Sequence, residues 1–384
     1  MKTYVFTNRV YPPVAGATGE LLKELAEGLA AAGARVLVVT SRESKNETAG
    51  RETINGVEVI RVGTVRFTRA SHWLRALSYA GLYPQFAWQV WKQGAVDAVV
   101  SMTDPPLQLA FVTLASFRAK KKIHWAQDLY PELAEELRVI PRNSLVARIL
   151  RAVSMWALAK QNKIVVLGRC MRERLVGRGI DEQKIEVIPN WTSVSEASET
   201  ESASVRERLG WSGKFIALYS GNLGLAHDFE TLVGAARRLD SGDIELVFAG
   251  EGPRLDEVRR LTAGLPCVSF LPAQPKQTLS AFLAAADVHL VTMRAELEGL
   301  VVPSKAYGVI ASRKPLIYVG PAGSEIARAI DETGAGTAVR NGDAEALVSA
   351  LRKEFANKSD SQASGGGGKL SLAIPLSRWC DILK

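Results

Sequence analysis

The sequence has few of the residues that hold metals and disulfides. Its 384 residues include four histidines and three cysteines, and Cys170, Cys267 and Cys380 lie far apart without a CxxC pair. This usage argues against a disulfide framework or a zinc site and fits a reducing compartment. The sequence also lacks a P-loop and a DxD pair that would carry Mg²⁺. We therefore expect no cofactor and no metal.

Long apolar runs are also lacking. No uninterrupted run reaches the length of a transmembrane helix, and the opening residues MKTYVFTNRVYPP turn polar too early for a signal peptide. The contents of 47% hydrophobic and 23% charged residues are ordinary for a soluble globular protein. A chain of this length exceeds one core, so we expect about two domains in a cytoplasmic protein.

Acidic residues are scarce in the N-terminal half. Residues 1–190 carry 27 Lys and Arg against 17 Asp and Glu, a net charge of +10, whereas residues 191–384 carry 21 against 23. A basic half can meet nucleic acid, an anionic membrane or a phosphorylated substrate, and it can also be only a solvated surface. Nucleic acid is disfavoured because no recognised binding motif accompanies the charge.

Short β-branched runs alternate with helical stretches in the first half, which predicts a parallel, doubly wound sheet. The expected strands are Thr3–Phe6, Arg35–Thr40, Val57–Val62, Ala98–Ser101, Ile123–Ala126, Ile164–Val166 and Ile185–Ile188. The alternation restarts later in the chain. The expected strands there are Phe215–Ser220, Glu245–Ala249, Val268–Leu271, Val288–Thr292, Leu316–Val319 and Gly336–Val339.

Composition marks the boundaries between these parts. A polar stretch rich in Ser and Glu predicts a linker at 191–204, between α/β domains at 1–190 and 205–357. A glycine-rich and polar segment at 358–369 cannot pack a core and predicts a flexible spacer. The amphipathic piece 370–384 is expected to form a helix that folds back onto the first domain. Two such domains place a ligand cleft between the carboxyl ends of their sheets.

Two loops of the first domain are candidates for binding. A small-residue loop containing Gly16 opens the first long helix, where backbone amides can approach phosphate or a sugar. Asp128 follows the fifth expected strand, at a strand end that faces the cleft. It can bind hydroxyls or accept a proton, or it can simply cap the next helix. His124 is interpreted as a strand residue.

The second domain carries three candidate loops. Gly221-Asn222 and Gly250-Glu251-Gly252 form tight, amide-rich turns after successive strands, as in a nucleotide pocket. In Glu296–Pro315, two carboxylates precede Ser304 and Lys305 at a helix start. Amides and lysine suit a diphosphate there, and carboxylates suit sugar or ribose hydroxyls. The alternative is a solvent-exposed acidic loop running into a capped helix.

Taken in order, these pieces resemble the family 4 glycosyltransferases of the GT-B fold, within the bacterial cell-surface polysaccharide group of the colanic acid and O-antigen type. The matching pieces span nearly the whole chain and include QDLYPE, VIPN, SGNLG, FAGEGP and EGLVVPSKAYGVIASRKP. The resemblance implies that the donor nucleotide binds the second domain, that the Gly16 loop approaches its diphosphate, and that Asp128 faces the acceptor. The implied donor contacts are Gly221, Asn222, Gly250, Glu251, Gly252, Glu298, Ser304 and Lys305.

Two departures from the family pattern alter this assignment. Many relatives have a basic pair after the GNLG-like turn, where this chain has Leu225–Asp228. Neutralisation of the phosphates then falls on Lys305, on Arg254 and Arg294, or on His227. The family's pair of glutamates is not intact either, because its second position is a glycine and Glu298 lies two residues too early to be the first. Ribose recognition by Glu298 is therefore in question.

The aromatic segment formed by residues 72–92 indicates where the acceptor would bind on the first domain. Its aromatic residues and nearby cations, with Trp73, Arg75, Trp88 and Trp91 among them, can seat a helix in a membrane interface. The alternative is an ordinary helix with core-packing aromatics. Together with the basic first half, this segment favours a lipid-linked diphosphate acceptor at the inner face of the plasma membrane.

These features and the resemblance together predict a metal-independent glycosyltransferase that moves a sugar from a nucleoside diphosphate-sugar to a hydroxyl acceptor, a lipid-linked saccharide precursor of a surface polysaccharide. The resemblance implies that the enzyme retains the anomeric configuration. Lys305 would assist departure of the diphosphate, and Asp128 would orient the acceptor or stabilise the developing cation. Two alternatives remain open: a GT-B enzyme of the nucleotide-sugar 2-epimerase kind, and a non-enzymatic two-domain sugar-binding protein.

Overall fold

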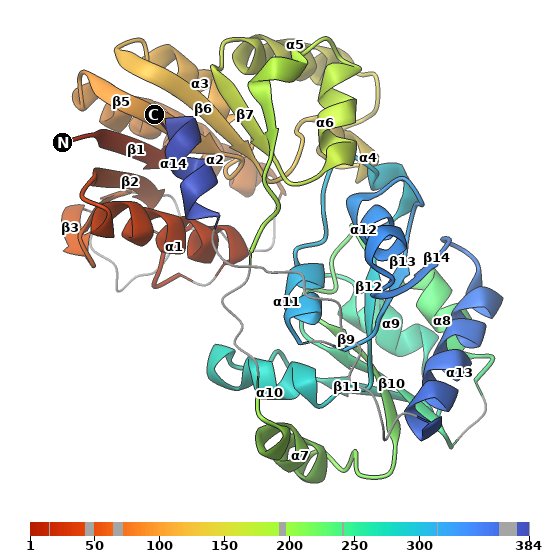
Figure 1. The fold of residues 1–384 in the computed structure, drawn as a ribbon. Helices are drawn as coiled ribbons and strands as arrows, with labels where there is room; N and C mark the ends of the chain where they lie inside the picture. The colour runs from red at the N-terminus through yellow and green to blue at the C-terminus, as the bar shows by residue number, and fades with distance from the viewer. Residues whose placement is uncertain are drawn as a thin grey trace. The chain divides into compact units, whose positions relative to one another are not determined.

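The computed structural model divides the chain into two compact units (Figure 1). Unit 1 comprises Met1–Trp191, Gly299–Val301 and Ile374–Lys384, and unit 2 comprises Thr192–Glu298 and Val302–Ala373. The structure describes residues 1–14, 16–42, 50–63, 72–191, 197–239, 242–312, 314–360 and 375–383.

Unit 1 is built on one eight-stranded sheet of order β3-β4-β2-β1-β5-β6-β7-β8, in which every pair is parallel except β3 with β4. The central strands are continuous apolar runs, as expected for a sheet that is covered on both faces. The strands are β1 (Thr3–Thr7), β2 (Arg35–Ser41), β3 (Gly50–Ile54), β4 (Val57–Val62), β5 (Val96–Met102), β6 (Ala119–Ala126), β7 (Lys163–Val166) and β8 (Ile185–Val187).

Helices cover both faces of this sheet. Alternate residues of β1 point to opposite sides, so Tyr4 and Phe6 pack with the α1 side chains while Val5 packs with Leu82 and Phe86 of α2. The helices of unit 1 are α1 (Ala17–Ala31), α2 (His72–Lys92), α3 (Gln108–Ala115), α4 (Glu132–Glu136), α5 (Leu145–Ala159), α6 (Arg169–Val176) and α14 (Leu376–Leu383), with a 3-10 turn η1 (Glu182–Lys184).

The C-terminal helix α14 lies beside α1 in unit 1, so the prediction that it folds back onto the first domain is confirmed (Figure 1). Trp379 is fully buried there, with its ring centroid 4.7 Å from that of Trp125. Trp191 stacks on the same Trp125 ring at 5.6 Å. Three tryptophans far apart in sequence thus pack together in the core on the α1 side of the sheet.

The edge strand β3 was not predicted from the sequence. Its residues GRETI are polar and mostly exposed, so no apolar alternation marks them. β3 pairs with β4 through a turn at Asn55 and Gly56, whose φ angles of 48° and 82° are those of a tight hairpin turn. The Asn-Gly dipeptide was the signal that could have found this strand.

Unit 2 is built on a six-stranded, fully parallel sheet of order β11-β10-β9-β12-β13-β14. Each strand overlaps a segment that the sequence predicted. The strands are β9 (Phe215–Ser220), β10 (Ile244–Ala249), β11 (Val268–Leu271), β12 (Val288–Thr292), β13 (Leu316–Val319) and β14 (Gly336–Val339).

Both faces of this second sheet are covered too. Phe215, Ala217 and Tyr219 of β9 pack with helices α8 and α13, while Ile216 and Leu218 pack with α7 and α10. The helices are α7 (Glu199–Arg208), α8 (Glu230–Ala236), α9 (Leu255–Leu261), α10 (Leu279–Ala284), α11 (Lys305–Ala311), α12 (Glu325–Thr333) and α13 (Ala344–Asp360), with 3-10 turns η2 (Lys276–Thr278) and η3 (Ala295–Leu297).

Two expected boundaries differ from the observed ones. Helix α7 begins at Glu199, inside the segment 191–204 that was expected to be a linker, because Ser198 and Glu201 form a capping box at its start. Helix α13 likewise runs to Asp360, into the segment expected to be a flexible spacer. Polar residues were taken as loop residues in both places, although capping and solvent-exposed helix turns use the same residue types.

None of the described helices is long and apolar enough to cross a membrane.

Candidate functional site

In unit 2 the turns after β9 and β10 are joined backbone to backbone. The amide of Gly221 donates to the Ala249 carbonyl at 2.8 Å, and the amide of Leu223 donates to the Glu251 carbonyl at 2.8 Å. Because the carboxyl ends of parallel strands meet at one edge of a sheet, both predicted glycine loops lie at that edge. The structure therefore brings Gly221, Asn222 and Gly250–Gly252 together.

Glycine is required at two of these positions. The φ angles of Gly250 and Gly252 are 145° and 152°, outside the range that side chains favour. A Cβ on Gly250 would overlap the Gly221 carbonyl oxygen, and one on Gly252 would overlap the Leu223 carbonyl oxygen. The two turns can approach this closely only because both residues lack a side chain.

Lys305 stands beside the same edge, at the start of α11. Its Nζ donates to the Tyr219 hydroxyl and lies 3.7 Å from the centroid of the Tyr219 ring. Its side chain also borders Gly221, because a Cβ there would lie 3.6 Å from Lys305 Cε. Within the described ranges no carboxylate forms an ion pair with Lys305, and loss of water around the ammonium lowers its pKa well below the ordinary value. A cation held in this state is complementary to an anionic ligand.

His227 is the neutral member of this cluster. Its Nδ1 donates to the Thr292 carbonyl at 2.7 Å, which leaves Nε2 as an acceptor. Burial, followed by the neighbouring charge of Lys305, lowers the pKa of His227 to about 3. An imidazole without charge cannot neutralise a phosphate, so the structure favours a hydroxyl as its partner.

Arg254 is fully engaged within the protein. Its guanidinium donates to Glu257 at 2.8 Å, to Glu230 at 2.7 Å and to the His227 carbonyl at 3.0 Å, and it lies over the Phe229 ring. These carboxylate hydrogen bonds raise the pKa of Arg254 above its ordinary value. Arg254 therefore holds the His227 loop in place, a positioning role that the sequence did not indicate.

The remaining donor candidates lie on three loops of unit 2. Asn222, Glu251 and Ser304 are exposed, the last directly before α11. Arg294 donates to Glu296 at 2.5 Å. Glu298 is partly buried, and its carboxylate lies against the backbone of Gly323, in the loop after β13.

In unit 1 the predicted phosphate loop leads into α1. Gly16 caps the helix without a side-chain hydrogen bond. A Cβ on Gly16 would lie 2.8 Å from Val10 Cγ1, and one on Gly19 would lie 3.0 Å from the Val10 carbonyl oxygen. The helix start therefore packs directly on Val10, and Gly16 offers its first amides no side-chain cap. Ala15 lies outside the described residues.

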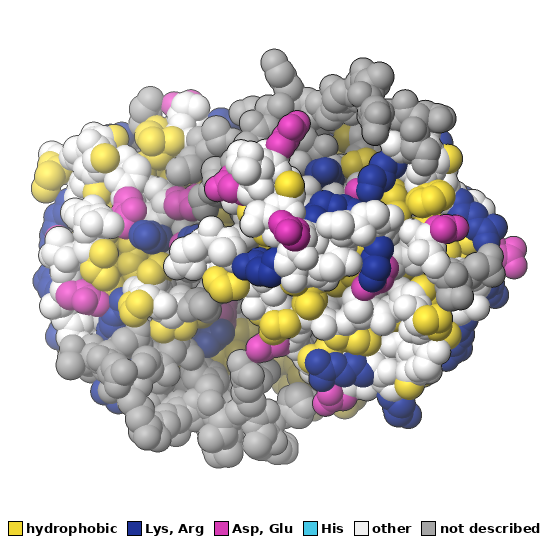
Figure 2. Space-filling view, turned by 90° about the horizontal axis from the view of Figure 1, so that it is seen from below, with side chains coloured by type: hydrophobic (Ala, Val, Ile, Leu, Met, Phe, Trp, Pro, Cys, Tyr) yellow, Lys and Arg dark blue, Asp and Glu magenta, His cyan; other side chains and the backbone are white. Residues whose placement is uncertain are grey.

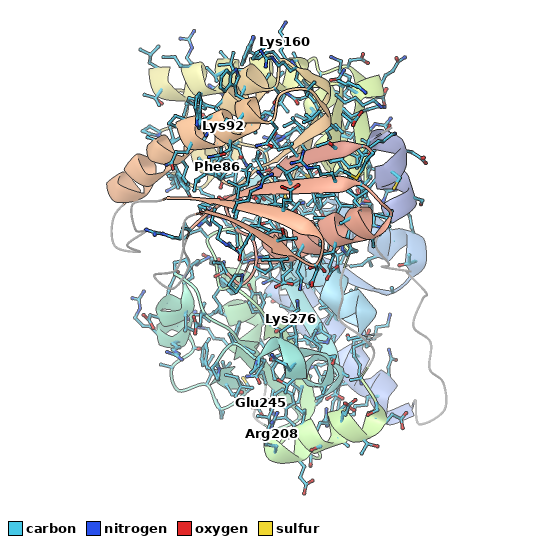
Figure 3. The ribbon with its side chains drawn as sticks, turned by 90° about the vertical axis from the view of Figure 1, so that its left-hand side faces the viewer. Phe86, Lys92, Lys160, Arg208, Glu245 and Lys276 are labelled. Carbon is cyan, nitrogen blue, oxygen red and sulfur yellow. The ribbon has the colours of Figure 1, made fainter. Side chains whose placement is uncertain are left out.

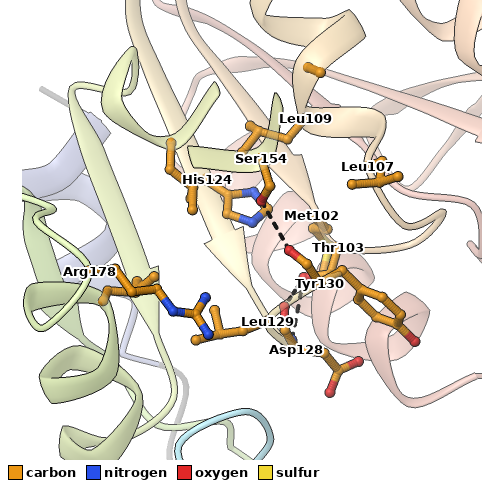
Figure 4. A pocket seen from close by; sticks show the side chains of 13 residues that line it. Met102, Thr103, Leu107, Leu109, His124, Asp128, Leu129, Tyr130, Ser154 and Arg178 are labelled. Carbon is orange, nitrogen blue, oxygen red and sulfur yellow. Dashed lines mark hydrogen bonds between the residues drawn. The ribbon is translucent and has the colours of Figure 1, made fainter. Parts of the chain in front are cut away.

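Asp128 lines a pocket of unit 1 at the carboxyl ends of β5 and β6 (Figure 4). Burial, and then the charge of Asp104, raise the pKa of Asp128 to about 7. A carboxyl group with this pKa can exchange a proton near neutral pH. The pocket is lined by Met102, Thr103, Leu107, Leu109, Ala110, His124, Asp128, Leu129, Tyr130, Ser154, Leu158, Leu175 and Arg178.

The other polar groups of this pocket have protein partners. Arg178 forms an ion pair with Glu132 at 2.7 Å, and Ser154 donates to the Tyr130 carbonyl at 3.0 Å. His124 lies on β6, as the sequence predicted, with Nδ1 2.8 Å from the Ser101 carbonyl oxygen and a pKa lowered by burial to about 4. Asp128 is thus the acid–base candidate of the pocket.

Two site residues were missed by sequence reasoning. Tyr219 orients Lys305, but in the sequence it has the pattern of an ordinary strand residue, since an aromatic residue at a strand end is common. Arg178 follows α6 and reaches the pocket only through the fold. The position of Tyr219 directly before the Ser220-Gly221 turn was the only available signal.

The aromatic segment is divided between core and surface. Leu82 and Phe86 are buried, whereas Trp88 and Trp91 are 51% and 42% exposed and stack on each other. The side chains of Trp73 and Arg75 lie outside the described part of the structure. Within that part no group of three or more His, Cys, Asp or Glu could hold a metal ion.

Two family models match the chain in sequence. The glycosyl transferase 4-like domain matches residues 16–191, and the glycosyl transferases group 1 model matches residues 214–357. These ranges include the two glycine turns at Gly221 and Gly250, the Asp128 pocket and Lys305. The chain belongs to the family 4 glycosyltransferases.

Two proteins similar in sequence to this glycosyltransferase are themselves named as glycosyltransferases. It is 31% identical over 245 residues to a probable glycosyltransferase of Pseudomonas aeruginosa, WbjE, in a match that covers 62% of this chain and 61% of the relative. It is also 24% identical to WcaI of Escherichia coli K12, a candidate colanic acid biosynthesis glycosyl transferase, over 92% of both chains.

Solved structures show the same GT-B fold. Sucrose-phosphate synthase from Thermosynechococcus elongatus superposes with a TM-score of 0.73 at 18% identity, covering 96% of this glycosyltransferase and 93% of the other chain. HepE from Anabaena, in complex with UDP-glucose, superposes with a TM-score of 0.72 at 14% identity, covering 100% and 99%.

Proposed function

We propose that this glycosyltransferase moves a sugar from a nucleoside diphosphate-sugar to an acceptor hydroxyl, with retention of anomeric configuration and without a metal. The observation that carries the proposal is Lys305, a cation without a carboxylate partner in the described structure, beside the amide-rich turn at Gly221. A diphosphate supplies the negative charge that this arrangement lacks. The likeness to HepE, solved with UDP-glucose, supports a uridine nucleotide.

In the proposed reaction the bond between the sugar anomeric carbon and the diphosphate oxygen breaks, and a bond to the acceptor oxygen forms. The transition state resembles an oxocarbenium ion, so catalysis depends on stabilising charge on the departing diphosphate. Lys305 and the turn amides supply that stabilisation. His227, held neutral by burial, accepts a hydrogen bond from a sugar hydroxyl.

Asp128 is proposed to act on the acceptor. With its pKa raised to about 7, its carboxylate can hold the acceptor hydroxyl and take up the proton that the hydroxyl loses. The proposed acceptor is a lipid-linked saccharide precursor of a surface polysaccharide at the inner face of the plasma membrane. The relation to WcaI, whose name refers to colanic acid biosynthesis, supports this class of acceptor.

The test is a transfer assay with UDP-sugars and a soluble saccharide acceptor, in which release of UDP and the glycosylated product are both measured. Lys305→Ala should lower turnover at least about a hundredfold, because one charge-stabilising group typically contributes that much. Tyr219→Phe serves as the matched control, since it removes only the hydroxyl that orients Lys305, and it should lower turnover less. Near-normal turnover of Lys305→Ala would contradict the assigned role.

The same assay separates the alternatives. Conversion of the UDP-sugar in the absence of any acceptor would indicate an epimerase instead. If the protein binds the UDP-sugar but releases no UDP in the presence of any acceptor, it is a sugar-binding protein.

A further inference from the structure

Three helices of unit 1 form a face that is apolar on the outside. Helix α3 lies next to both α2 and α5. The Tyr83 ring of α2 stacks on Phe111 of α3 at 4.8 Å, and Gln161, just after α5, donates to Thr113 of α3 at 2.8 Å. We define this α2–α3–α5 face as the outward side of these three helices.

Helix α5 presents the widest apolar stripe. Leu145, Ile149 and Trp156 are 71%, 53% and 41% exposed, and their spacing of four and seven residues places them on one side of the helix. Ala157 and Leu158 are buried on the opposite side. An α-helix that is apolar on its outer side as well as its inner side is unusual on a protein that meets only water.

Helices α2 and α3 continue this surface. Leu114 and Phe117, on one side of α3 and its last turn, are 64% and 59% exposed. Trp88 and Trp91 of α2 are exposed and stacked, with Lys92 Nζ 5.2 Å from the Trp88 ring centroid. Aromatic rings beside cations are typical of the zone between lipid headgroups and acyl chains.

The three helices carry cations and no carboxylate of their own. Residues 72–92, 108–115 and 145–160 contain five Lys or Arg and no Asp or Glu, and one of the five, Arg151, pairs with Glu135 of α4. Lys92, Arg148 and Lys160 are exposed among them, and Figure 3 marks Lys92 and Lys160 together with the buried Phe86. By contrast, the face in Figure 2 intersperses Lys and Arg with Asp and Glu.

The inner sides of two of these helices line the Asp128 pocket. Leu109 and Ala110 of α3 and Ser154 and Leu158 of α5 contribute to its wall. A surface that bound the outer side of α3 and α5 would therefore lie one helix thickness from Asp128, about 10 Å.

We infer that the α2–α3–α5 face is a monotopic membrane-binding surface that docks unit 1 on an anionic lipid bilayer. Its apolar side chains enter the headgroup boundary, and Lys92, Arg148 and Lys160 lie against lipid phosphates. This inference deepens the proposed function and rests on it only for the lipid-linked acceptor, which docking would deliver to the Asp128 pocket from the bilayer.

The first experiment measures binding of the full chain to vesicles of phosphatidylglycerol mixed with phosphatidylcholine, and to pure phosphatidylcholine. We expect binding to the anionic vesicles that weakens as salt is raised. The variant Lys92→Glu/Arg148→Glu/Lys160→Glu should bind them at least about a hundredfold less tightly, since each cation near the surface contributes roughly a factor of five.

The matched control is Arg208→Glu/Arg260→Glu/Lys353→Glu, which reverses three exposed cations of unit 2 with the same change of net charge. It should keep most of the vesicle binding. Equal loss in both triple variants would overturn the inference, because net charge alone would then explain the binding.

A second pair of variants tests the apolar contribution. Leu114→Asp/Ile149→Asp should weaken vesicle binding by about tenfold or more, whereas Leu225→Asp, at an exposed leucine of unit 2, should not. Circular dichroism and thermal unfolding confirm that the variants are folded. If the double variant instead dissociates a dimer in analytical ultracentrifugation and leaves vesicle binding unchanged, the face binds a second copy and the inference is wrong.

The outcome is independent of the proposed chemistry. Transfer to a soluble acceptor should be unaffected by the unit 1 surface variants. Absence of transfer activity in the wild-type chain would therefore refute the proposed function, whereas absence of vesicle binding by the wild-type chain would refute only the docking surface.

Discussion

Two cations of unit 2 show how partners decide the role of a residue. Arg254 is surrounded by Glu230 and Glu257, so an incoming phosphate would have to displace a carboxylate. The Lys305 ammonium donates to the Tyr219 hydroxyl and lies over the Tyr219 ring, and burial, which deprives its charged form of hydration, lowers its pKa. A bound diphosphate would relieve that cost. The sequence placed both residues at the site, and only the contacts separate them.

The ionisation of Asp128 gives a prediction at this scale. Because its pKa is raised to about 7, the folded state holds its proton more tightly than the unfolded state does. The resulting stability is present in acid and is lost as pH rises from about 4 through about 7. Asp128→Asn cannot ionise, so its melting temperature relative to wild type should be higher near pH 8.5 than near pH 5.

Differential scanning calorimetry at the two pH values measures this difference. Asp256→Asn, whose side chain is 97% exposed, is the control and should show no such trend. A melting-temperature difference for Asp128→Asn that does not change with pH would show that Asp128 is not desolvated in the fold.

The joined glycine turns give a second prediction. Gly250→Ala places a Cβ against the Gly221 carbonyl oxygen, so we expect a loss of about 3 kcal/mol or more in the free energy of unfolding. Gly264→Ala is the matched control. Its φ of +81° is also unfavourable to a side chain, but a Cβ there meets nothing within 4 Å, so its loss should be about 1–2 kcal/mol. Urea denaturation measures both, and equal losses would mean that the turns can separate without cost.

At the scale of helices and strands, the sequence predicted the elements that follow a repeated pattern of apolar residues. Alternation of apolar strands with helices gave both parallel sheets, since buried parallel strands are continuous apolar runs. The polar hairpin strand β3 was missed because pairing at an exposed edge needs no apolar pattern. The outward stripe of α5 was missed for a related reason: periodicity shows that Leu145 and Ile149 share a side of the helix, but not whether that side faces the core.

Helix α14 gives the prediction at this scale. Trp379 is completely buried against Trp125, so Trp379→Ala should lower the free energy of unfolding of unit 1 by about 3–5 kcal/mol. Ser377→Ala changes an exposed residue of the same helix and should cost well under 1 kcal/mol. Denaturation followed by tryptophan fluorescence measures both. An unchanged stability in Trp379→Ala would show that α14 does not dock on unit 1 in solution.

At the scale of the whole molecule, the two units have different chemical characters. The net charge of +10 lies in residues 1–190, which form most of unit 1, and there it concentrates in segments without a carboxylate. Residues 191–384, which form most of unit 2, are nearly balanced in charge, and Arg254 there is held in ion pairs with Glu230 and Glu257. This division fits a basic unit that meets an anionic surface and a second unit that binds a single diphosphate through Lys305.

The central claim is that unit 2 binds a nucleoside diphosphate through Lys305 and its glycine turns. The most direct measurement is thermal unfolding of the full chain and of Lys305→Ala with UDP, GDP and ADP. A nucleotide present at a hundred times its dissociation constant should stabilise the wild-type chain by about 2.7 kcal/mol, and the variant should need a much higher concentration for the same shift. If no nucleotide shifts the transition, or if one shifts both proteins equally, the account of this site is wrong.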